Sequence, residues 1–226
     1  MRKSVRLLLG LAALASAAVA ASEEAGVPVH VVTYVEATPA AGEEAAALLR
    51  AFGAASRGRD GNLRLEILRR EGRPGHFAVL ESWQDRLALE AREAAVAELR
   101  ARLAPLLVAP YDRRPHTGLI AEPAEAGDRD AVHVVTHVDV VPPAKEQGTA
   151  LLKDLAEASA GDAGRLRFEV LQQNSRPNHF TLVEAWRDRA AYEAHIAAAH
   201  TRRFRDALLP LTGSLYDERL YRRLDP

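Results

Sequence analysis

The sequence contains two copies of one pattern, and this repeat constrains the fold more than any other feature. The letters VHVVT occur at residues 29–33 and return at residues 132–136, an offset of 103 residues. The same offset relates Trp83 to Trp186, the only two tryptophans in the chain. A repeat that keeps its order and spacing indicates a duplication. Two copies are too few for a solenoid, so we interpret them as two duplicated domains.

The two copies differ slightly in length. Near their ends the offset grows from 103 to 105 residues, since Pro105 pairs with Pro210 and Tyr111 with Tyr216. The second copy therefore has two extra residues in the region after its tryptophan. We expect this region to form a helix in both copies, with a short last strand that holds the tyrosine.

Each copy predicts the same order of strands and helices. Residues 29–36 and 132–140 alternate in polarity and are rich in β-branched side chains, which is typical of strands. An amphipathic helix of about four turns follows, then a hairpin of two strands that ends at the tryptophan. With the second helix and the last strand, the order β-α-β-β-α-β is that of a ferredoxin-like unit, an antiparallel sheet with both helices on one face.

One such unit leaves the second face of its sheet uncovered, and two units can cover each other. We therefore predict the α+β fold class, with two tandem ferredoxin-like domains packed sheet to sheet. The expected boundaries are a first domain at residues 27–113, a linker at 114–129 and a second domain at 130–226. The proline and glycine residues of the middle segment indicate the linker.

The N-terminus predicts a secretory signal peptide at residues 1–20. The positive residues Arg2, Lys3 and Arg6 precede an apolar run that is short for a membrane span, and a small-residue cleavage site ends at Ala20. An uncleaved N-terminal anchor is the alternative. Because no second apolar run follows, we expect a periplasmic or secreted protein without stable membrane insertion.

Composition excludes several kinds of site and partner. The chain has no cysteine, which excludes disulfides, thiolate zinc sites and cysteine nucleophiles. Its formal net charge is -1, and arginines alternate with acidic residues, so we expect no nucleic-acid partner. No phosphate loop, nucleophile elbow, EF-hand or flavin fingerprint is present, so we expect no cofactor.

One pattern in the second copy is specific enough to indicate a family. Glu184 and Trp186 end a predicted strand, His195 follows nine residues after the tryptophan, and His200 and the aromatic Phe204 come next. This pattern resembles that of the antibiotic biosynthesis monooxygenase (ABM) domain. The resemblance is specific in the second copy and weaker in the first. It implies a dimeric α/β barrel formed within one chain, so that the two copies make an internal pseudo-dimer. Whether the protein also forms homo-oligomers stays open.

The resemblance also implies a function: a cofactor-independent monooxygenase that acts on a small aromatic or quinol substrate with O2. In such a reaction the protein deprotonates the substrate, and the resulting anion reacts with oxygen. Two other functions remain open, a non-catalytic small-molecule-binding barrel and haem binding with His195 or His200 as axial ligand. Side chains filling the space beside Trp186 would favour the non-catalytic barrel, and an open pocket there would favour the enzyme or a ligand binder.

The histidines that follow Trp186 are the leading catalytic candidates. The pKa of an unperturbed histidine suits proton transfer near neutral pH, so His195 is the predicted base or anchor. Five residues of an ideal helix turn by about 140°, so His195 and His200 do not share a face unless the helix is broken, which argues against a metal pair. The first copy has Arg92 in place of His195, so we expect chemistry in the second copy alone.

Trp186 has two compatible interpretations, a buried packing residue and a wall for a flat substrate. On the first strand of the second copy, His133 matches His30 of the first copy, which favours a structural role. His137 replaces Tyr34 and is the better candidate for a specific site. The predicted set is His195, Trp186 and His200 as catalytic residues, His137, His133, Glu184 and Phe204 as substrate-binding residues, and no metal ligand.

Overall fold

The computed structural model describes residues 26–122 and 131–224, so the predicted signal peptide lies outside the described residues. The first copy comprises β1 (Val29–Glu36), η1 (Pro39–Ala41), α2 (Gly42–Ser56), β2 (Asn62–Arg70), β3 (His76–Trp83), α3 (Arg86–Glu90), α4 (Glu93–Leu103), η2 (Ala104–Leu106) and β4 (Asp112–Ile120). The second copy comprises β5 (Val132–Asp139), η3 (Pro142–Ala144), α5 (Lys145–Ala158), η4 (Ser159–Gly161), β6 (Arg165–Gln173), β7 (His179–Trp186), α6 (Arg189–Ala197), α7 (Ala199–Leu208), η5 (Leu209–Leu211) and β8 (Asp217–Arg223).

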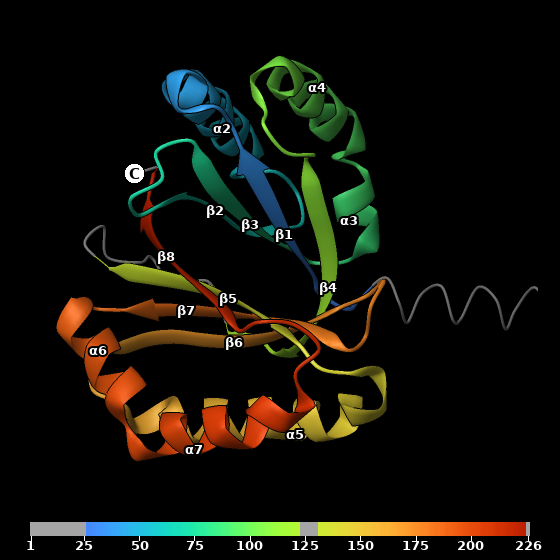
Figure 1. Ribbon diagram of the computed structural model, residues 1–226. Helices are drawn as coiled ribbons and strands as arrows, with labels where there is room; N and C mark the ends of the chain where they lie inside the picture. Colours follow the sequence, from blue (N-terminus) through green and yellow to red (C-terminus); the bar gives the residue numbers. More distant parts are fainter. Residues whose placement is uncertain (1–25, 123–130, 225–226) are drawn as a thin grey trace, which may run out of the picture.

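The strands of both copies close into one antiparallel barrel in the order β1-β3-β2-β8-β5-β7-β6-β4. The last strand of each copy makes the closure, because β4 pairs with β1 and with β6, and β8 pairs with β5 and with β2. The helices of the two copies lie on opposite sides of the strands (Figure 1). The predicted fold class, two ferredoxin-like units joined in an intrachain barrel, is confirmed.

The strand β4 extends into the segment that the sequence predicted as a linker from residue 114. Its backbone is paired on both edges, with β1 on one side and with β6 of the second copy on the other. Such pairing satisfies the backbone donors and acceptors of the segment, which explains why it is a strand despite its proline and glycine. The first copy therefore reaches Ile120, and the other domain boundaries stay predictions.

Two further expectations about local structure need correction. The single helix predicted after each tryptophan is two helices, α3 and α4 in the first copy and α6 and α7 in the second. The predicted last strands begin one residue after Tyr111 and Tyr216 rather than containing them. Asp188 begins α6 by accepting a hydrogen bond from the backbone N–H of Ala191 at 2.8 Å, a typical N-cap.

Alternation along the strands gives the barrel wall two faces. One face packs beneath the helices, where Trp83 and Trp186 are fully buried. The other face fills the barrel interior with side chains from both copies, among them Val32 and Leu68 of the first and Val135 and Tyr221 of the second. Each copy thus has its own helix-facing core, and the two share the interior core. Among the described residues, no helix is long and apolar enough to cross a membrane.

Candidate functional site

Four of the predicted site residues meet beneath the helices of the second copy. Trp186, at the end of β7, donates its indole N–H to Oε2 of Glu184 at 2.9 Å. The imidazole of His195, on α6, stacks on the Trp186 ring with centroids 4.5 Å apart and planes 28° apart. The ring of His200, on α7, lies 5.7 Å from that of His195. Four of the residues proposed from the sequence therefore lie together, and their roles stay predictions.

A break between α6 and α7 brings the two histidines to one carboxylate. Ala198 has an extended backbone, with φ -64° and ψ 147°, so the chain changes direction between them. Asp162, in the loop before β6, places Oδ2 at 2.7 Å from Nδ1 of His195 and at 3.1 Å from Nε2 of His200. The sequence argument that they do not share a face required a continuous helix, and that condition does not hold.

The space beside Trp186 is filled by side chains. Trp186 is 0% exposed, His195 4% and Tyr192 5%. Phe204 is also buried and packs edge to face against Tyr216, with ring centroids 6.4 Å apart. A substrate could reach His195 only if these side chains moved. Of the two outcomes weighed from the sequence, this is the one that favours a non-catalytic barrel.

Burial controls the protonation of the carboxyl group and the imidazole in this cluster. Burial raises the pKa of Glu184 to about 8, against the opposing effect of its hydrogen bond from Trp186. Burial also lowers the pKa of His195, although Asp162 opposes this shift. At neutral pH we therefore expect a protonated Glu184, with Oε2 4.0 Å from Nε2 of a neutral His195.

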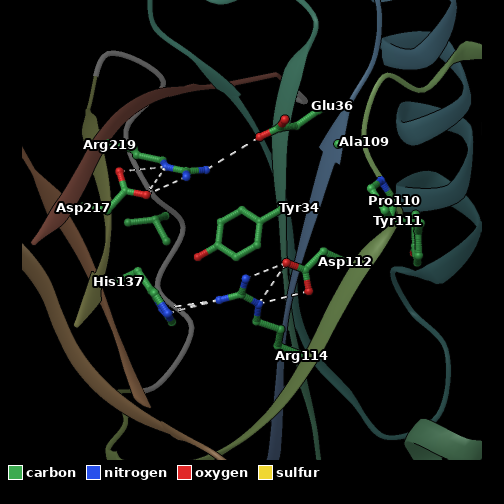
Figure 2. Close-up of a pocket in the computed structure, with 11 residues that line it drawn as sticks. Tyr34, Glu36, Ala109, Pro110, Tyr111, Asp112, Arg114, His137, Asp217 and Arg219 are labelled. Atoms are coloured by element: carbon green, nitrogen blue, oxygen red, sulfur yellow. Dashed lines mark hydrogen bonds and ion pairs between the residues drawn. The ribbon is translucent and has the colours of Figure 1, made fainter. Parts of the chain in front are cut away.

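An open cavity of about 410 Å³ lies elsewhere, where β1 and β5 end and β4 and β8 begin. We call it the barrel-mouth cavity, and Figure 2 shows it. Both copies line it, and its ring-bearing and charged residues include equivalent pairs. These pairs are Tyr34 with His137, Arg114 with Arg219, and Asp112 with Asp217.

Tyr34 lies between the two arginines of the barrel-mouth cavity (Figure 2). The guanidinium carbon of Arg114 is 5.1 Å from the centre of the Tyr34 ring, and that of Arg219 is 5.5 Å from it. Each arginine is held by its own aspartate, with Nη2 of Arg114 2.6 Å from Asp112 and Nε of Arg219 2.8 Å from Asp217. Two arginines, each paired with an aspartate, therefore line one small space.

His137 is the predicted site residue that the barrel-mouth cavity contains. Its Nε2 lies 2.8 Å from Oδ1 of Asp139, and Nη1 of Arg114 lies 3.3 Å from the same nitrogen. Burial lowers the pKa of His137, and Asp139 opposes this shift. A neutral imidazole that faces a cavity and lies beside a carboxylate can accept a proton from a bound hydroxyl group.

The other predicted substrate-binding histidine lies deeper. His133 is 1% exposed, and neither ring nitrogen has a hydrogen-bond partner among the described residues. Burial lowers its pKa to about 4. It does not line the barrel-mouth cavity, in agreement with the structural role that its match to His30 favoured.

The sequence did not predict the arginines of the barrel-mouth cavity, nor Asp162, the aspartate that contacts both His195 and His200. The arginines carry a signal that could have found them, because an aspartate and an arginine two residues apart recur at Asp112 and Arg114 and again at Asp217 and Arg219. Asp162 carries no such signal. It lies in a turn, and its counterpart in the first copy is an arginine.

The architecture defines a tandem barrel protein in which each copy supplies half of the strands. The family model of the antibiotic biosynthesis monooxygenase matches residues 28–102 and 131–207. The chain therefore belongs to this family and contains two copies of its domain, one in each half of the barrel.

Individual relatives support the same fold. An uncharacterized protein of Synechocystis sp. is 28% identical over 85 residues, 38% of this chain and 57% of that protein, so the match spans just over half the length of this curated relative. A solved structure from Fusobacterium nucleatum, whose name suggests a monooxygenase, has TM-score 0.78 and 17% identity over 88% of this chain and 93% of that chain. An anthrone oxidase-like protein has TM-score 0.70 and 14% identity over 87% and 91% of the two chains. At these identities the solved structures show the fold alone.

Proposed function

We propose that this protein is a cofactor-independent monooxygenase whose small aromatic or quinol substrate binds in the barrel-mouth cavity. The observation that supports the proposal is His137, paired with Asp139, beside two arginines in a cavity of about 410 Å³. Family membership supports the reaction class. The proposal moves the base from His195 to His137, because His195 is packed against Trp186.

The proposed reaction begins with a proton transfer from a substrate hydroxyl group to His137, which lies beside Asp139. The positive charges of Arg114 and Arg219 stabilise the resulting anion. The anion reduces O2 without a cofactor, since the substrate supplies all four electrons. One oxygen atom enters the substrate, and the other leaves as water with two hydrogens from the substrate.

Oxygen uptake by the purified protein with a panel of hydroquinones and related phenols tests this proposal. We expect His137→Ala to lower the rate by about 100-fold or more, which is typical for loss of a general base. His195→Ala is the comparison variant and should retain most of the rate if the variant folds. Uptake that survives in His137→Ala and is lost in His195→Ala contradicts the assignment of the base.

A non-catalytic small-molecule-binding barrel is the second candidate, and the filled space beside Trp186 favours it. Calorimetry with the same quinols under argon separates the two functions. Binding that requires Arg114 and Arg219, without oxygen uptake by any variant, supports the binding protein. Haem binding has less support, because His195 and His200 both face Asp162; a Soret band on haem addition that disappears in His200→Ala would revive it.

Export is part of the proposal because of the predicted signal peptide at residues 1–20. Cleavage after Ala20 predicts a mature protein that begins at Ala21 in the periplasm or the medium. Mass spectrometry of cell fractions measures the mature N-terminus. An intact N-terminus in the membrane fraction would instead indicate an uncleaved anchor.

A further inference from the structure

We propose that the second copy binds a divalent transition-metal ion between Asp162, His195 and His200. One ligand atom from each of these residues lies within 4.8 Å of the others. The site is beneath the helices and separate from the barrel-mouth cavity. It therefore does not depend on the function proposed above.

The distances suit a metal ion with small adjustments. Oδ2 of Asp162 is 2.7 Å from Nδ1 of His195 and 3.1 Å from Nε2 of His200. Metal bonds of about 2.0–2.2 Å to nitrogen and oxygen ligands require ligand atoms about 3 Å apart. Three separate elements supply the ligands, namely the loop before β6, the helix α6 and the helix α7. The break at Ala198 is what turns both histidines toward the same point.

The ligand set indicates the class of ion. Two imidazoles and one carboxylate suit zinc and its first-row neighbours, whereas calcium and magnesium prefer oxygen ligands alone. The side chains of Asp162 and His200 are 19% and 18% exposed, so an ion and a bound water have access from the solvent. His200 also lines a groove of about 290 Å³ that residues of α5 and α7 border.

The surroundings of His195 hold its ring in place for binding. The ring stacks on Trp186, and Nε2 faces Oε2 of Glu184 at 4.0 Å. The stack on Trp186 fixes the ring orientation and leaves Nδ1 facing Asp162 and the proposed ion. Nε2 faces the protonated carboxyl group of Glu184 beyond hydrogen-bond distance.

The first copy provides an internal comparison. The repeat places Arg59 at the position of Asp162 and Arg92 at the position of His195. The guanidinium carbon of Arg92 lies over Trp83, 5.8 Å from its ring centre, and Arg92 also donates a hydrogen bond to Ser56. The fold therefore does not need a histidine above its tryptophan. Two arginines would repel a cation, so we expect binding in the second copy alone.

A second group of possible ligands competes with this assignment. His137, Asp139 and His179 also bring three ligand atoms within 4.8 Å of one another. Nη1 of Arg114 lies 3.3 Å from Nε2 of His137, and this fixed positive charge opposes a cation there. The geometry therefore favours the Asp162 group.

The test is calorimetric titration of Zn²⁺ into the mature protein, prepared without a histidine tag and stripped with a chelator. Co²⁺ absorption in parallel reports nitrogen and oxygen coordination. We expect one equivalent to bind and both His200→Ala and Asp162→Asn to weaken binding by about 100-fold or more. These two side chains are partly exposed, so their variants should fold, which circular dichroism checks. His179→Ala, in the competing group, is the matched control and should bind as the unaltered protein does.

Three outcomes overturn the proposal. The first is no heat and no Co²⁺ spectrum with the unaltered protein. The second is unchanged affinity in both His200→Ala and Asp162→Asn. The third is binding that is lost in His179→Ala and kept in His200→Ala, which assigns the ion to the competing group. None of these readouts uses oxygen uptake, so the metal site can fail while the proposed function stands.

Discussion

Arg64 of the first copy donates two hydrogen bonds to Glu169 of the second, at 3.0 and 2.6 Å, inside the barrel. The repeat maps this pair onto Arg167 and Glu66, whose hydrogen bond is 2.7 Å long. One contact is thus made twice across the internal pseudo-twofold axis, as at the interface of a symmetric dimer. Burial favours the neutral form of Glu66, but Arg167 and Arg64 outweigh it and hold its pKa at about 2.

Breaking one of these ion pairs should destabilise the protein more than replacing both partners. Arg64→Met leaves Glu169 as a buried charge without its main partner, which should cost about 3–5 kcal/mol in the free energy of unfolding. The double variant Arg64→Met/Glu169→Leu should cost much less, because two apolar side chains need no partners. Urea unfolding near neutral pH measures both, and a double variant as unstable as the single one contradicts this explanation.

Buried histidines of the barrel interior should make stability depend on pH. Burial lowers the pKa of His116 and His133 to about 4 from the ordinary value of 6.5. Between pH 6.5 and about 4 the unfolded chain binds protons that the folded protein does not. Their contribution is therefore complete above pH 6.5 and falls as the pH falls through this window.

Urea unfolding at several pH values in that window measures the slope. His133→Gln removes one of the titrating groups, so its stability should fall less steeply with decreasing pH than that of the unaltered protein. His76→Gln is a suitable control, because His76 is a partly exposed histidine at the start of β3. Equal slopes for all three proteins would show that His133 does not titrate as expected.

If the metal site is present, Zn²⁺ should raise the stability of the folded protein. An ion at 100 times its dissociation constant stabilises by about 2.7 kcal/mol when it binds the folded state alone. Thermal unfolding with and without Zn²⁺ should show this shift in the unaltered protein. The shift should disappear in His200→Ala, and a shift of the same size in that variant would indicate binding elsewhere.

The two tryptophans should behave alike if both are packing residues. Trp83→Phe and Trp186→Phe each reduce a fully buried ring and remove a hydrogen bond to a buried glutamate. We expect each to cost about 1–3 kcal/mol of unfolding free energy and to leave quinol binding in the barrel-mouth cavity unchanged. Loss of quinol binding in Trp186→Phe alone would restore the interpretation of Trp186 as a substrate wall.

Most of the fold was predictable from the repeat. The periodicity of apolar residues in strands and helices is a local signal, and it occurs in both copies. The features that the sequence missed depend on distant partners. The strand β4 extends to Ile120 because it pairs with β6 of the other copy, which no local pattern reveals. Ala198 breaks the helix without glycine or proline, so the meeting of His195 and His200 at Asp162 was not predictable from spacing. The barrel-mouth cavity likewise exists only where the two copies meet.

Tyr34 and His137 occupy equivalent positions of the two copies and line the same cavity. In a barrel built from two identical chains, symmetry would put the same side chain at both positions. A single chain removes this restriction, because each half is encoded separately. The phenol of Tyr34 can then line one side of the cavity and the imidazole of His137 the other. A mutation can change the side chain on one side and leave the side chain on the other unchanged. The tandem repeat therefore allows a kind of pocket that a homodimer could not encode.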